Sequence, residues 1–132
     1  MALPKTAPAS VGASAPVVTL HVPLTPETRS MFGAAQLARM KHGAVLVNTS
    51  RGEVVDEPAL IAALDEGRIA GAALDVRGVE PPARGRLNEM PNVIMLPHIG
   101  AFTHEAQARV IDAICRDVRA VLTGGEGLEY VN

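Results

Sequence analysis

Apolar residues gather in four short runs along this chain, and polar or helical segments separate them. The runs cover residues 17–22, 44–48, 68–76 and 92–97. Each run is apolar at consecutive positions and rich in Val, Ile, Leu or Ala, which is typical of a short strand buried on both faces. Glycine and alanine in the third run indicate a closely packed neighbour. We therefore predict four buried strands.

Helix signals lie between these strands. Thr25 is placed to cap a helix that has Pro26 at its first position and Glu27 in its first turn. A second helix is predicted over about residues 34–40, and a third begins after the capping residue Asp56. Strands and helices are thus expected to alternate along the chain.

A longer helix is predicted after the fourth strand. Thr103 caps it, and it continues to about residue 122. One face of this helix is apolar and is formed by Val110, Ile111, Ile114, Val118 and Val121. The segment 77–92, which precedes the fourth strand, is rich in Pro and Gly and is predicted to be a loop.

This alternation predicts an α/β fold with a parallel sheet of about four strands and helices on both faces. Four strands amount to about half of a doubly wound, Rossmann-like domain, so the fold is expected to be a partial one. Ligands of such sheets bind beyond the carboxyl ends of the strands. The candidate site residues at those ends are His21, Pro23, residues 48–51, Asp75, His98 and Gly100.

Composition narrows the function classes. Hydrophobic residues make up 48% of the 132 residues and charged residues 20%, which is enough for a packed core. The formal net charge of −2 offers no basic field for nucleic acid, and no apolar run approaches the length of a membrane span. The single cysteine fits a reducing compartment. We expect a cytoplasmic protein with no nucleic acid or membrane partner and no metal site.

The first 16 residues differ in composition from the rest. They are rich in Ala, Pro and Ser and lack the apolar stretch of a secretory signal. We expect residues 1–16 to be a disordered tail or a cloning remnant, and residues 17–132 to form one domain.

Three residues at or near the strand ends carry candidate chemistry. Arg51 has a permanently charged guanidinium that can bind a carboxylate through two hydrogen bonds. His98 has the side chain best suited to acid–base work near neutral pH. Glu80 can pair with a histidine, favour its charged form and fix its tautomer. Taken singly, each is more simply explained as an exposed turn or loop residue. Asp75 can cap a turn or accept a hydrogen bond from a ligand amide.

The order of these residues, together with the segments that surround them, indicates that they belong to one site. The segments "HVPLTPETRSMF", "NTSRG", "EPP" and "PNVIMLPHIGAFTHEA" resemble the D-isomer-specific 2-hydroxyacid dehydrogenase family. The resemblance covers about residues 17–132 and implies the carboxyl-terminal half of that family's NAD-binding domain. It implies that Arg51 binds the substrate carboxylate, that His98 is the acid–base, and that Glu80 pairs with His98. The cofactor contacts that it implies are Pro23, Thr49, Ser50, Arg51, Asp75, His98 and Gly100.

The resemblance implies an oxidoreductase that acts on a small 2-hydroxy or 2-oxo acid with NAD or NADP. Hydride would pass between the nicotinamide and the substrate carbon, while His98 exchanges a proton with the substrate oxygen. Asp75 would lie near the nicotinamide amide. Glu80 argues against a formate dehydrogenase, in which glutamine is usual at the resembling position.

The sequence also departs from the family pattern. No G-x-G-x-x-G motif follows a strand, so cofactor binding is expected to be weak. The family's substrate domain has no counterpart in the sequence, Arg77 replaces a usual aromatic residue, and Phe102 replaces a usual small one. We therefore expect a truncated chain that is a poor catalyst alone.

An alternative function follows from the same departures, namely a non-catalytic half-domain that associates with itself or a partner. Some relatives in the resembling family act as transcriptional corepressors. Loss of a neighbouring half-sheet would leave residues 17–22 as an unpaired edge, and the final "LEYVN" would be a further loose end. We therefore expect a homo-oligomer.

Overall fold

The computed structural model describes residues 13–125. The chain divides into two compact units, the first ending at His98 and the second beginning at Ile99, and each is described by itself below. Most of the expected tail, residues 1–12, and the "LEYVN" segment lie outside the described residues.

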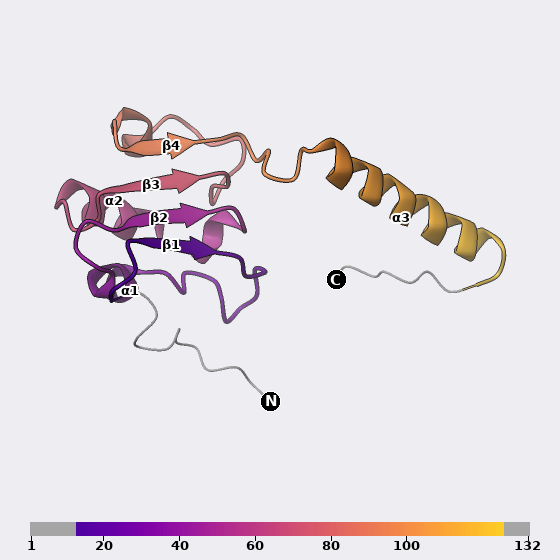
Figure 1. The fold of residues 1–132 in the computed structure, drawn as a ribbon, viewed down its shortest axis with the longest axis horizontal. Coiled ribbons are helices and arrows are strands. Elements are labelled where there is room, and N and C mark those ends of the chain that lie inside the picture. The colour runs from indigo at the N-terminus through magenta and orange to yellow at the C-terminus, as the bar shows by residue number, and fades with distance from the viewer. Residues whose placement is uncertain (1–12, 126–132) are drawn as a thin grey trace. The chain divides into compact units, whose positions relative to one another are not determined.

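The first unit is built on a parallel sheet of four strands. The strands are β1 (Val17–Leu20), β2 (Val45–Asn48), β3 (Gly71–Leu74) and β4 (Val93–Met95). They pair in the order β1-β2-β3-β4, and all three pairings are parallel (Figure 1). The predicted α/β fold with a Rossmann-like parallel sheet is therefore confirmed, although each strand is shorter than its apolar run.

Two of the predicted helices of this unit are present. They are α1 (Ala34–Arg39) and α2 (Glu57–Asp65), and they contact each other. Asp56 caps α2 as predicted, since its carboxylate accepts a hydrogen bond of 3.1 Å from the Ala59 N–H. Two short 3₁₀ helices, η1 (Gly52–Val54) and η2 (Arg86–Glu89), lie in the connections.

The helix predicted after Thr25 is wrong, because the chain forms a turn there. The Thr28 hydroxyl donates 2.7 Å to the Pro23 carbonyl and folds this segment back on itself. The Ser30 N–H then donates to the Glu53 carbonyl at 2.7 Å instead of to a preceding turn. Local capping signals are thus overridden by hydrogen bonds to a distant segment.

The core of the first unit lies on one face of the sheet. Residues of that face, including Leu20, Leu46 and Leu74, are buried together with Leu37 of α1 and Leu60 of α2. Residues that point to the other face are more accessible. Val17 is 53% exposed and Ile94 is 64% exposed.

The close neighbour predicted for the third strand is present. A Cβ atom at Gly71 would lie 2.6 Å from the carbonyl oxygen of Asn92, just before β4. That oxygen accepts a hydrogen bond of 3.1 Å from the Ala72 N–H. Glycine at this position lets the two backbones approach.

The second unit contains the long helix α3 (His104–Leu122). Thr103 caps it as predicted, accepting 3.1 Å from the Ala106 N–H. The five residues of its predicted apolar face are each between 51% and 58% exposed. Over residues 13–125, no helix combines the length and apolar character needed to cross a membrane.

Candidate active site

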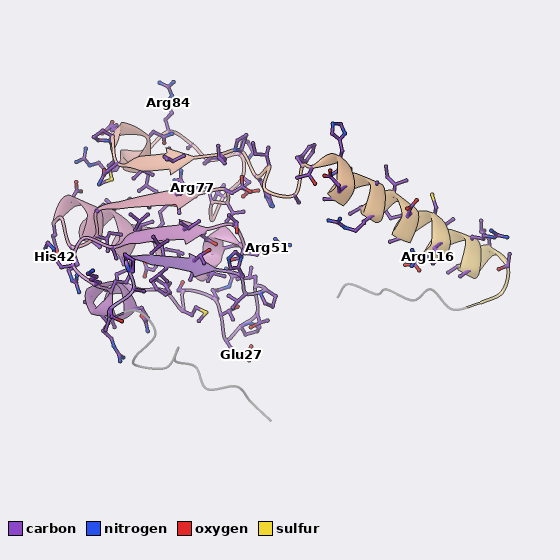
Figure 2. The ribbon with its side chains drawn as sticks, viewed as in Figure 1. Glu27, His42, Arg51, Arg77, Arg84 and Arg116 are labelled. Atoms are coloured by element: carbon purple, nitrogen blue, oxygen red, sulfur yellow. The ribbon has the colours of Figure 1, made fainter. Side chains whose placement is uncertain are left out.

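The four strands end level with one another. Leu20, Asn48, Leu74 and Met95 are the last residues of their strands, and each is the register partner of the next across the sheet. The residues that follow each strand therefore leave the sheet at one edge. Figure 2 shows Arg51 at this edge.

The turn after β2 is shaped by Asn48, which is 1% exposed. Its side-chain oxygen accepts hydrogen bonds from the Ser50 N–H at 3.0 Å and the Ser50 hydroxyl at 2.8 Å. Its side-chain nitrogen donates to the Arg51 carbonyl at 2.9 Å. These bonds are those of an Asx turn, which explains why a buried strand runs directly into a polar segment. They also fix the backbone that carries Arg51.

Arg51 is exposed, and its guanidinium donates 2.8 Å to the carbonyl of Ser50. It lines a cavity of about 200 Å³. The full lining is Arg51, Gly52, Glu53, Val76, Arg77, Gly78, Glu80 and His98. A permanent positive charge thus lies on the same cavity as a carboxylate and an imidazole.

Glu80 and His98 form a hydrogen-bonded pair beside this cavity. Glu80 Oε2 lies 2.8 Å from His98 Nδ1, and Glu80 Oε1 accepts 3.1 Å from the Arg77 N–H. The backbone of His98 is held as well, since its N–H donates 2.8 Å to the Asp75 carbonyl. His98 adopts a left-handed φ of 58°, which only a few per cent of non-glycine residues do.

This pairing lowers the pKa of Glu80 below that of an ordinary carboxyl group. The hydrogen bond from His98 is the largest cause, and the Arg77 N–H is the second. Because the folded chain favours the carboxylate, the pair stabilises folding above the ordinary carboxyl pKa. That contribution is lost as the pH falls through the lowered pKa of Glu80. Both side chains are more than a third exposed, so solvent screens the charges.

A second cavity, of about 270 Å³, shares Arg77, Glu80 and His98 with the first. Its lining is Asp75, Arg77, Glu80, Pro81, Pro82, Leu96, Pro97 and His98. Asp75 is 5% exposed and follows β3, where its N–H donates 3.0 Å to the Asn48 carbonyl. This cavity therefore combines largely apolar walls with one buried carboxylate.

The structure brings some of the candidate residues together and leaves others apart. Arg51, Glu80 and His98 line one cavity, and Asp75 lines the next. Pro23, Thr49 and Ser50 follow β1 and β2 at the same edge but line neither cavity. Gly100 belongs to the second unit, as does Phe102, which is 74% exposed.

Two residues with clear structural roles at this site escaped the sequence analysis. Gly52 faces the backbone of Arg77 and Gly78 so closely that a Cβ atom would lie under 3.0 Å from it. Glu57, in the first turn of α2, forms an ion pair with Arg77. The sequence held one indirect signal for Glu57. Arg77 stands where the resembling family usually has an aromatic residue, and an arginine that is buried there needs a partner of opposite charge.

Within residues 13–125, no group of three or more His, Cys, Asp or Glu side chains is arranged to hold a metal ion.

Comparison with known proteins identifies what this arrangement resembles. Residues 3–100 match the model of the D-isomer specific 2-hydroxyacid dehydrogenase NAD binding domain. The chain is 46% identical over 115 residues to a D-3-phosphoglycerate dehydrogenase of Synechocystis sp., an alignment that covers 87% of this chain and 21% of that protein.

Solved structures of the same family also match this chain. A D-lactate dehydrogenase with NAD⁺ from Lactobacillus jensenii matches with a TM-score of 0.83 and 34% identity over 96% of this chain and 42% of that one. A 2-hydroxyacid dehydrogenase from Xanthobacter autotrophicus Py2, solved with NADPH and MES, matches with a TM-score of 0.80 and 39% identity. That match covers 94% of this chain and 51% of the other. The chain thus spans between a fifth and about half of the length of these proteins.

Proposed function

Because this chain belongs to the D-isomer specific 2-hydroxyacid dehydrogenase family, we propose that Arg51, Glu80 and His98 form the substrate side of an oxidoreductase site. The reaction interconverts a small 2-hydroxy acid and its 2-oxo acid with NAD or NADP. The observation that carries the proposal is the 2.8 Å pair of Glu80 and His98 on a cavity that Arg51 also lines.

The pair gives His98 the properties of an acid–base group. Glu80 occupies Nδ1 of the imidazole, so Nε2 is the atom that exchanges a proton with the substrate oxygen. A carboxylate accepts only, so it fixes the tautomer with the proton on Nδ1 and stabilises the imidazolium. His98 then donates from Nε2 during reduction and accepts at Nε2 during oxidation.

Arg51 supplies the orientation of the substrate. A guanidinium binds a carboxylate through two parallel hydrogen bonds, which fixes the plane of the acid as well as its position. Glu53 and Glu80 line the same cavity and balance its charge in the absence of an anion. Positioning of this kind converts binding into a favourable reacting geometry.

The residues of the second cavity fit a nicotinamide. Leu96 and the neighbouring prolines offer flat apolar walls, and the Asp75 carboxylate can accept a hydrogen bond from the ring amide. When bound, the nicotinamide supplies the hydride chemistry. We propose Pro23, Thr49 and Ser50, which follow β1 and β2 at the same edge of the sheet, as further cofactor contacts.

We expect this binding to be weak, because the sequence contains no glycine-rich turn for the pyrophosphate. Calorimetric titration with NAD⁺ should therefore give a dissociation constant weaker than the micromolar range.

The proposal is tested by binding of oxamate, an unreactive analogue of a 2-oxo acid. In the presence of NADH, oxamate should shift the NMR signals of Arg51 and His98. Arg51→Leu should weaken binding about 10- to 100-fold, because hydrogen bonds between charged groups contribute about 1.5–3 kcal/mol.

Arg84→Leu is the matched control for that titration. It removes the same charge, but Arg84 lines neither cavity and projects away from the sheet (Figure 2). Equal oxamate affinities for the two variants, or shifts confined to residues away from both cavities, would reject the proposal.

Exposed apolar surface favours a second candidate function, self-association without catalysis. Within the described residues of the first unit, β1 and β4 are the edges of the sheet. In the second unit, Ile111 and Ile114 of α3 are 58% and 56% exposed. Several large apolar side chains exposed on one helix are uncommon on monomers. We propose that a second copy of the chain covers it, giving a homodimer or larger oligomer.

Light scattering at several concentrations tests this association. The 13.8 kDa chain should give at least twice its monomer mass, and Ile114→Asp should lower that mass because it introduces a charge into the apolar surface. A wild-type mass that stays monomeric into the high micromolar range would contradict self-association.

A further inference from the structure

Arg77 makes an unusually complete set of contacts for an arginine in a loop. Its Nε lies 2.9 Å from Glu57 Oε2, and one terminal nitrogen lies 2.6 Å from Glu57 Oε1. The other terminal nitrogen lies 3.1 Å from the sulfur of Met95 in β4. The Arg77 side chain is only 9% exposed, against 37% for Glu57. The pair is bidentate and its arginine is buried, so it is stronger than an ion pair between two solvated side chains.

The ion pair joins two elements that are distant in sequence. Glu57 is the first residue of α2, and Arg77 lies in the loop after β3. A carboxylate in the first turn of a helix is itself favoured by the helix dipole, so Glu57 is a well-held anchor. Gly52 limits the loop from the other side, because the backbone of Arg77 and Gly78 packs directly on it.

The same residue touches the acid–base pair through its backbone. The Arg77 N–H donates 3.1 Å to Glu80 Oε1, while Glu80 Oε2 faces His98 Nδ1. One residue therefore binds α2 with its side chain and Glu80 with its main chain. Any displacement of the loop would move both carboxylate oxygens of Glu80 relative to the imidazole.

We propose that Arg77 is a positioning residue for the reaction, in which its ion pair with Glu57 holds its own N–H against Glu80 and so sets the alignment of Glu80 with His98. The role of Arg77 in the reaction rests on the proposed function, whereas the alignment is a property of the folded chain. We call the Arg77–Glu57 ion pair, together with the Arg77 N–H bond to Glu80, the ionic clamp.

The pKa of Glu80 is a direct reporter of this alignment. The charged or titratable groups that face it are His98, Arg77 and Asp75, and Arg51 and Glu53 share its cavity. Hydrogen bonds from His98 and from the Arg77 N–H hold this pKa below its usual range. A loop that moved would weaken both bonds and raise the pKa of Glu80.

The test is a carbon-13 NMR titration of the Glu80 carboxyl in the 132-residue chain. We expect Arg77→Leu to raise the pKa of Glu80 toward its ordinary value. Glu57→Gln should also raise the pKa of Glu80, because the glutamine amide leaves the Arg77 guanidinium without its counter-charge. Arg77→Lys, which retains a positive charge, should restore part of the lowering relative to Arg77→Leu.

Arg86→Leu is the matched control for this titration. Arg86 forms an ion pair with Asp65 at 2.6 Å, and neither residue lines a cavity at the site. This variant should leave the pKa of Glu80 unchanged. If Arg77→Leu does not fold, the partly exposed Glu57→Gln decides the question. Folded variants in which the Glu80 pKa stays at its wild-type value would overturn the proposal.

These outcomes are separate from those of the oxamate experiment. The titration requires no substrate or cofactor, so the alignment can hold where oxamate binding fails. A different outcome would separate the two proposals. If oxamate binding depends on Arg51 but the pKa of Glu80 is unchanged in Arg77→Leu and Glu57→Gln, the proposed function is supported and the positioning role of Arg77 is rejected.

Discussion

Gly52→Ala is expected to destabilise the folded chain by about 3 kcal/mol, at the upper end of the usual cost of overpacking. The added Cβ atom would meet the backbone of Arg77 and Gly78 at less than 3.0 Å. Backbone atoms cannot rotate away as the end of a flexible side chain can, so the loop after β3 must move. Urea denaturation monitored by circular dichroism measures the loss as a lower midpoint.

Gly78→Ala provides the control for this substitution. Gly78 lies in the same loop, but a Cβ atom there would have nothing within 4 Å. We expect a change in stability of no more than about 0.5 kcal/mol, as for an ordinary surface substitution. If the two alanine variants unfold at the same urea concentration, the close approach at Gly52 has no energetic importance.

Leu46→Ala is expected to cost about 2–5 kcal/mol of folding free energy. Leu46 is fully buried, at 0% exposure, in the central strand β2. Removing its side chain loses apolar burial and leaves a cavity between the sheet and the helices. The expected loss is a large part of the roughly 5–15 kcal/mol that stabilises a typical small domain.

Ile94→Ala tests whether that cost depends on the face of the sheet. Ile94 lies in β4 and is 64% exposed, so its truncation should change stability by only about 0.5 kcal/mol. Thermal and urea unfolding at low protein concentration compare the two variants. A loss for Ile94→Ala as large as that for Leu46→Ala would show that the accessible face is in fact covered.

The sequence was sufficient to predict the strands because their apolar pattern is a property of consecutive residues. It also located α2 and α3, where Asp56 and Thr103 cap the helices through short-range hydrogen bonds. The segment after Thr25 has equally good local signals but forms a turn. Its outcome depends on Ser30 and Glu53, whose hydrogen bond joins separate segments.

The location of the candidate residues at one edge of the sheet was predictable in the same way. The rule that ligands bind at the carboxyl edge of a parallel sheet selected Arg51, Asp75 and His98, and Glu80 was a candidate because a carboxylate can pair with a histidine. The Arg77–Glu57 pair was not predictable, since 20 positions separate the two residues in sequence. A charge partner at that distance is set by the packing of α2 against the loop, which no local pattern encodes.

The strand order places the Glu80–His98 pair next to an edge of the described sheet. Each strand pairs with the next in sequence, and within the described sheet β4 is an edge strand joined to β3 by a register of three residues. Local opening reactions begin at such weakly held edges and require less free energy than global unfolding. Detachment of β4 would carry His98 away from Glu80 and Asp75 while β1, β2 and β3 remained paired. Detachment of β4 is therefore one route by which His98 loses its alignment with Glu80 without global unfolding, and amide hydrogen exchange in β4, and not the melting temperature, measures the free energy of that opening.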